Sequence, residues 1–188
     1  MHYFVLGNGR SRLQLNLMSL DSKVFGCNGL YRDFSPDVLI ATDPEITGEI
    51  ERSGYALQHD FYTRNPEIGS GAKLITKKSG YSSGPIALAY AASEEPQIIY
   101  MFGFDFMGIE GKHNNVYSGT PAYKAIGTKE TYYGNWINQI EEIIKENKRV
   151  KFFHMLPRLA DIAPFKALPN YKQFTFTGPK YSDFTQAK

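Results

Sequence analysis

Short apolar segments recur along the chain, and each ends in a glycine-rich or polar turn. The strand-like segments, in which nearly every residue is apolar, are residues 2–6, 23–27, 38–42, 73–76, 97–103 and 150–156. Strands without polar alternation are buried on both faces, which is typical of a mostly parallel sheet covered by helices. The pattern also indicates one strand at a sheet edge, over residues 173–177.

Helical segments alternate with these strands. Asp43 and Pro44 form a start signal for a helix that is expected to end near Arg52, because Asp caps helices and Pro is favoured at the first helical position. Residues 86–92 are rich in alanine, and residues 131–146 carry apolar side chains at helical spacing with charges opposite. The alternation predicts a three-layer α/β fold, with helices on both faces of the sheet.

The length of the chain suits one domain. A chain of 188 residues buries about two-thirds of its unfolded surface. We expect this domain to span residues 1–170, followed by a C-terminal tail over residues 171–188. Residues 107–130 form a long connection before the final helix, and such a connection is usually a lid or a binding segment.

Composition and charge exclude several classes of protein. The 21 basic and 19 acidic residues give a net charge of +2, which offers no basic face for nucleic acid. No apolar run is long enough to span a bilayer, and the first residues lack the features of a secretory signal. Cys27 is alone, so no disulfide framework or cysteine zinc site is expected. We therefore expect a cytoplasmic protein, and a homo-oligomer is left open.

Glycine and polar residues collect where the predicted strands end. They are Gly7, Asn8 and Gly9, then Asn28, then Asp43, and finally Gly103 and Asp105. Because ligands of such sheets bind beyond the carboxyl ends of the strands, these residues are predicted to line one nucleotide-binding cleft. Glycines let backbone amides approach an anion, and asparagine can bind a base, a ribose or a sugar hydroxyl.

Each motif also has a purely structural interpretation. The first glycine pair would suit a tight turn, and Asn28 a left-handed turn residue. Asp43 would suit a helix cap. Ser82, Ser83 and Gly84 precede the alanine-rich helix, where they would serve as an anion cradle, as an N-cap, or as both. Asp105 lies between two aromatic residues just past a buried strand, where a carboxylate is costly unless it is paired.

A family resemblance rests on several short motifs in a fixed order. The motifs are GNG at residues 7–9, FGCN at 25–28, SSG at 82–84, IIYMFGFDF at 98–106, MLPR at 155–158 and IAP at 162–164. In this order, over roughly residues 1–164, the chain resembles the bacterial sialyltransferases of glycosyltransferase family 42 and the related MptE-like (DUF115) proteins.

The resemblance implies a Rossmann-like fold that binds a cytidine-monophosphate sugar without a metal or other cofactor. The sugar would pass, with inversion, to an unknown glycan or small-molecule acceptor. The matching positions that would hold the nucleotide sugar are Asn8, Asn28 and Asp43, while Ser82 and Ser83 would meet its phosphate or carboxylate. Tyr117 would match a tyrosine that stabilises the departing phosphate.

Sugar transfer also needs a base that removes the proton of the acceptor. The chain has 4 histidines. His2 begins the first strand, His154 lies in an apolar strand and is expected in the core, and His59 is poorly placed. His113 lies in the same loop region as Tyr117, where a lid would fold over the donor. His113 is therefore predicted to be the base, although an exposed histidine in so polar a stretch is more often inert.

Two other functions remain open at this point. One is a magnesium-dependent, diphosphokinase-like transfer of a phosphoryl group, with Asp43 and Asp105 as oxygen ligands of the metal. The other is a non-catalytic protein that binds a nucleotide or a partner, since a fold does not determine a function.

Overall fold

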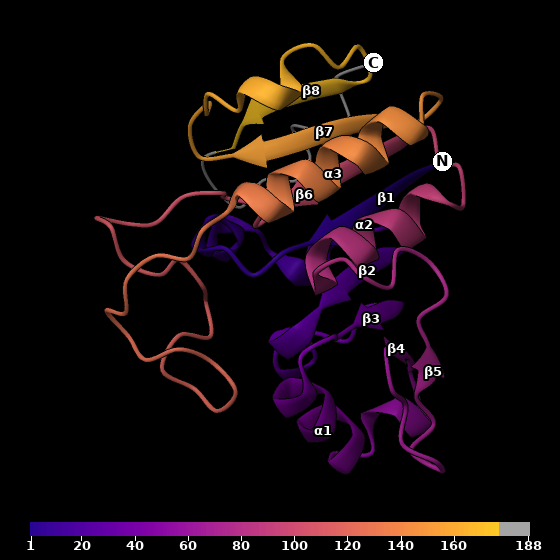
Figure 1. The fold of residues 1–188 in the computed structure, drawn as a ribbon. Helices are drawn as coiled ribbons and strands as arrows, with labels where there is room; N and C mark the ends of the chain where they lie inside the picture. Colours follow the sequence, from indigo (N-terminus) through magenta and orange to yellow (C-terminus); the bar gives the residue numbers. More distant parts are fainter. Residues whose placement is uncertain (177–188) are drawn as a thin grey trace.

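A parallel sheet forms the centre of the computed structural model, which describes residues 1–176 (Figure 1). The sheet is 8-stranded, in the spatial order β5, β4, β3, β2, β1, β6, β7, β8, and every neighbouring pair is parallel. Its strands are β1 (His2–Leu6), β2 (Val24–Cys27), β3 (Val38–Ile40), β4 (Asp60–Thr63), β5 (Lys73–Leu74), β6 (Ile98–Phe102), β7 (Lys151–Leu156) and β8 (Tyr171–Thr175). The predicted α/β fold with a mostly parallel sheet is confirmed.

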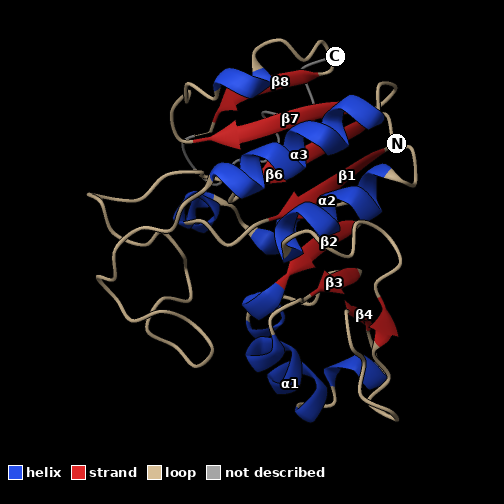
Figure 2. Cartoon of the chain, viewed as in Figure 1, coloured by secondary structure: helices blue, strands red, loops and turns tan. Residues whose placement is uncertain are grey.

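Helices cover both faces of this sheet (Figure 2). The α-helices are α1 (Pro44–Arg52), α2 (Ser83–Ala92) and α3 (Gly134–Glu146), and the short 3-10 helices are η1 (Arg10–Gln14), η2 (Leu17–Ser19), η3 (Asn28–Arg32), η4 (Tyr55–Leu57) and η5 (Ala163–Phe165). Alternate residues of β1 explain the two layers, because Val5 packs with α2 and α3 while Phe4 packs in the cluster that contains α1. No helix among residues 1–176 has the length and apolar character needed to cross a membrane.

Several boundaries differ from those expected. Strand β4 was not predicted, because Asp60 and its polar surroundings hide an edge-side strand in the sequence. Strand β8 overlaps the predicted edge strand and lies in the segment expected to be a tail. Its residues pair with β7 and so belong to the sheet. Residue 177, the last of the predicted edge strand, lies outside the described residues.

The order of the strands defines where a ligand can enter. The chain builds outward from β1 through β2 to β5, and then returns to place β6 on the other side of β1. At such a switch point the loops that follow the two adjacent strands diverge and leave a crevice. In Figure 1 the arrowheads of β1 and β7 point to the side from which the loop of residues 107–131 projects.

His154 lies in the core beneath this edge, as its apolar strand predicted. It has no exposed surface, and both ring nitrogens have partners. Nδ1 lies 2.7 Å from the Tyr171 hydroxyl, and Nε2 lies 2.8 Å from the Phe104 carbonyl oxygen. A carbonyl can only accept, so Nε2 carries the proton and the neutral ring receives one from Tyr171.

This histidine should make stability depend on pH. Burial lowers the pKa of His154 from 6.5 to about 4, so between these values the unfolded chain binds a proton that the folded protein does not. The contribution is present above pH 6.5 and is lost as the pH falls towards 4, by about 1.4 kcal/mol per pH unit. We expect the free energy of unfolding, measured by urea denaturation at several pH values, to fall more steeply between pH 6.5 and 4 in wild type than in His154→Gln. The same dependence on pH in the two proteins would contradict this prediction.

Candidate functional site

A cleft of about 470 Å³ opens at the carboxyl edge of the sheet, around the switch point between β1 and β6. Every residue predicted to bind a ligand lines this cleft: Gly7, Asn8, Gly9, Asn28, Asp43, Ser82, Ser83, Gly84, Gly103 and Asp105. His113, the predicted base, lines it as well. Tyr117 does not. The structure thus brings together residues that are far apart in the sequence.

The floor of the cleft is formed by two backbone turns in close contact. The Gly7 amide donates to Phe102, and the Gly9 amide donates to Gly103, at 2.8 and 2.9 Å. Gly103 has a left-handed backbone with φ of 72°, and a Cβ placed there would lie 2.5 Å from the Gly7 carbonyl oxygen. These glycines are therefore required by the close approach of the chain to itself, whatever ligand the cleft holds.

The Asp105 carboxylate joins the loop after β1 to the loop after β6. It accepts hydrogen bonds from the Ser11 hydroxyl and the Ser11 amide, and a third from the Asn114 side chain at 2.8 Å. The charge is thus paired with donors, as its position near aromatic residues requires. Because three of the roughly four acceptor positions of this carboxylate are already used, Asp105 is a poor ligand for a magnesium ion shared with Asp43. No cluster of three or more metal-ligating side chains occurs in the described part of the chain.

Two asparagines present oxygen atoms that have no hydrogen-bond partner. Asn8 is 7% exposed; its Nδ2 donates to the Cys27 carbonyl at 3.0 Å, and its Oδ1 is buried without a partner. Asn28 Oδ1 is also buried without a partner, and the backbone of Asn28 has a φ of 53°. Asn28 is therefore both a left-handed turn residue and a lining residue. Because a buried acceptor costs free energy until it is paired, these oxygens suit a ligand with hydroxyl or amino groups.

The serines at the start of α2 are partly engaged by the protein. Ser82 Oγ accepts a hydrogen bond from Trp136 Nε1 at 2.9 Å, which leaves its own proton for a ligand. Ser83 is buried, and its Oγ accepts from the Thr42 amide at 3.1 Å. Asp43 precedes α1 as predicted, but its side chain makes no capping hydrogen bond. Its exposed carboxylate is therefore available at the rim.

Tyr117 holds the loop of residues 107–131 instead of facing a ligand. Its side chain is 5% exposed; the hydroxyl donates to Asp33 at 2.6 Å and accepts from Arg12 at 3.1 Å. Burial raises its pKa above the ordinary value. Arg32 also fixes this segment, because it donates to Thr120 at 2.8 Å. The predicted role of Tyr117 at a departing phosphate does not fit this position.

His113 lies on the loop side of the cleft. Its Nδ1 is 3.2 Å from the Thr131 hydroxyl, which also accepts a hydrogen bond from Lys124 at 3.2 Å. Burial, with the nearby Lys124 charge, lowers the pKa of His113 below its usual 6.5. The ring is therefore neutral at pH 7 and can accept a proton.

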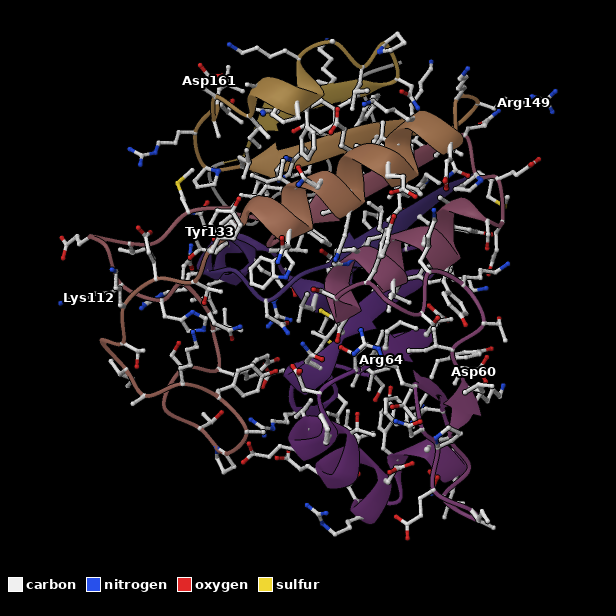
Figure 3. All side chains as sticks on the ribbon, viewed as in Figure 1. Asp60, Arg64, Lys112, Tyr133, Arg149 and Asp161 are labelled. Carbon is white, nitrogen blue, oxygen red and sulfur yellow. The ribbon has the colours of Figure 1, made fainter. Side chains whose placement is uncertain are left out.

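Other lining residues were not predicted from the sequence. The side chains that add charge or ring surface include Arg64, Tyr123, Lys124, Tyr133 and Trp136. The Tyr133 and Trp136 rings pack with their centroids 5.4 Å apart, and Figure 3 shows Tyr133 at the start of α3. Helical spacing had suggested a core position for Trp136. In the structure Trp136 lines the cleft and donates a hydrogen bond to Ser82, 54 residues earlier.

These features define an α/β protein with a cleft at the switch point of its sheet, lined by polar and aromatic side chains. No family model matches the chain, and neither the curated proteins nor the solved structures that were searched contain a match. The resemblance to sialyltransferases therefore stays a prediction from short motifs.

Proposed function

We propose that the protein binds a nucleotide-activated sugar in this cleft and transfers the sugar, with inversion, to a glycan or small-molecule acceptor. The observation that supports it best is that all the predicted binding residues line one cleft of about 470 Å³. Such a volume suits a ligand of nucleotide-sugar size. The proposal includes a cytoplasmic location, expected from the single cysteine.

The chemistry follows from the side chains around the cleft. The acceptor oxygen forms a bond to the anomeric carbon while the bond from that carbon to the phosphate oxygen breaks. The acceptor proton passes to neutral His113, and the phosphate leaves with the bonding electrons. The Ser82 amide donates to Gln139 and Pro85 has no N–H. The amides of Ser83 and Gly84, in the first turn of α2, are suited to stabilise the negative charge on the leaving phosphate.

A second candidate is a non-catalytic protein that binds nucleotides. The position of Tyr117 favours it, because a tyrosine expected at the leaving group holds a loop instead. Turnover separates the two candidates. A thermal-shift screen with nucleotides and nucleotide sugars would identify the ligand, and chromatography of the products would then detect sugar transfer or donor hydrolysis. Binding without turnover favours the second candidate, and absence of any nucleotide binding contradicts both.

Asn28 provides a direct test of the nucleotide site. Because its φ is 53°, alanine would add backbone strain, whereas Asn28→Gly keeps the conformation and removes only the side chain. We expect Asn28→Gly to bind nucleotide about 3- to 10-fold more weakly, as for the loss of one hydrogen bond, with little change in melting temperature. Unchanged affinity in a calorimetric titration would remove Asn28 from the site.

A further inference from the structure

Arg64 brings an uncompensated positive charge to the cleft. It lies just after β4 and lines the cleft together with the start of α2. No carboxylate among residues 1–176 forms an ion pair with its guanidinium. Two carboxylates line the same cleft: Asp105 already accepts three hydrogen bonds from the protein, and Asp43 lies exposed at the rim without an ion pair to Arg64. The charge of Arg64 is therefore left for a ligand.

The guanidinium is held in one orientation by backbone carbonyls. Nε donates to the Ser79 carbonyl at 2.7 Å, and Nη2 donates to the Tyr81 carbonyl at 2.6 Å. Nη1 forms no hydrogen bond with any residue of the described chain. Carbonyl oxygens orient the group without neutralising it, so the guanidinium keeps both its full charge and free donors.

This arrangement places the charge next to the start of α2. Tyr81, which binds Arg64, immediately precedes the N-cap residue Ser82. Helix α2 has 10 residues, no side-chain cap and no acidic residue in its first turn. Its first amides therefore lack partners within the helix, and they add to the positive potential. Figure 3 shows Arg64 beneath the start of this helix.

A second observation points to a ligand at the same place. Asn8, 7% exposed, lines the cleft with an Oδ1 that has no partner. Cys27 lies between Asn8 and the start of α2: its Sγ is 3.8 Å from Asn8 Nδ2 and 4.0 Å from where a Cβ on Gly84 would be. The cleft therefore contains both a positive region, at Arg64 and the start of α2, and a buried acceptor, Asn8 Oδ1, which lacks a hydrogen-bond donor.

We propose that Arg64 and the first turn of α2 bind the phosphate of the ligand, while Asn8 accepts a hydrogen bond from a hydroxyl or amino group of the same molecule. The ligand class is a phosphate ester that carries hydrogen-bond donors. The assignment rests on the proposed function only for the nucleotide identity of that ester.

The test compares ligands that differ only in the phosphate. Calorimetric titrations with cytidine monophosphate and cytidine would be made on wild type, Arg64→Gln, Arg64→Lys and Arg149→Gln. Arg149 is the matched control, because it is exposed at the far end of α3 from Tyr133 (Figure 3). Melting temperatures would verify that each variant folds.

We expect Arg64→Gln to bind cytidine monophosphate about 10- to 100-fold more weakly, as for the loss of a charged hydrogen bond. The affinity for cytidine should fall less than about 2-fold. Arg64→Lys, which keeps the charge but loses the planar fork, should give a smaller loss, and Arg149→Gln none. An equal loss for both ligands, or no loss for either, would overturn the assignment.

The outcome is separable from that of the proposed function. If wild type binds cytidine monophosphate through Arg64 but transfers no sugar, the phosphate site stands and the transferase proposal fails. If wild type binds no nucleotide, inorganic phosphate becomes the probe. Phosphate binding that is lost in Arg64→Gln would support the anion site alone, and absence of phosphate binding would overturn it.

Discussion

Replacing His113 with glutamine should lower the rate of sugar transfer about 100- to 10,000-fold, the usual effect of removing a positioned base. Donor binding should change little, because glutamine is uncharged like the neutral imidazole that it replaces. Single-turnover assays of transfer, with nucleotide affinity measured in parallel, separate the two effects. His59→Gln is the control, because His59 stacks on Tyr55 and does not line the cleft. Full activity of His113→Gln from pH 5 to 9 would exclude the base assignment.

The pH profile gives an independent test of the same residue. Burial and the Lys124 charge lower the pKa of His113 below 6.5, so the rate should be maintained down to that pH and fall only below it. Lys124→Met removes the charge, so the fall in rate at low pH should begin at a higher pH in this variant. If the fall begins at the same pH as in wild type, a different group titrates.

Replacing Gly103 with alanine should destabilise the protein by about 2–6 kcal/mol. A left-handed backbone costs alanine about 1–3 kcal/mol, and forcing atoms into a filled space costs about 1–3 kcal/mol more. The new Cβ would meet the Gly7 carbonyl oxygen at 2.5 Å, and neither backbone segment can move away without disturbing the floor of the cleft. Urea denaturation monitored by fluorescence would measure the loss.

Gly80→Ala is the matched control for this substitution. A Cβ on Gly80 would meet no atom within 4 Å, and its φ is not in the left-handed range, so its stability should change by less than about 0.5 kcal/mol. If Gly103→Ala unfolds at the same urea concentration as Gly80→Ala, the two turns do not approach each other as described.

The sheet was predictable because its central strands are mostly apolar and lack polar alternation. The segments at residues 98–102 and 152–156 are almost wholly buried, which is typical of strands in a covered parallel sheet. The strand at Asp60–Thr63 was missed because it begins with an exposed aspartate, which forms an ion pair with Lys73 on the neighbouring edge strand. Such a pairing between neighbouring strands cannot be read from the local pattern of either segment.

The position of the cleft could be predicted from the strands, whereas the positions of the loops around it could not. Residues at the carboxyl ends of parallel strands must share one edge, so Asn8 and Asn28 could be placed together from the strand pattern. The position of Tyr117 depends on Arg12 and Asp33, which lie 105 and 84 residues away in the sequence. The hydrogen bonds that turn Arg64 towards α2 likewise arise only in the folded chain.

The central position of β1 has a consequence for synthesis of the protein. Of the eight strands of the sheet this one is synthesised first, yet its second neighbour β6 lies far along the chain. Met1 and Gln97, which form a hydrogen bond next to the β1–β6 pair, are 96 residues apart. At ordinary rates of translation this separation corresponds to a delay of about 5–20 s. Throughout that time one edge of β1, with its apolar residues, has unpaired backbone groups of the kind that promote aggregation. A nascent chain stalled before β6 therefore exposes an edge of a strand that lies at the centre of the finished sheet.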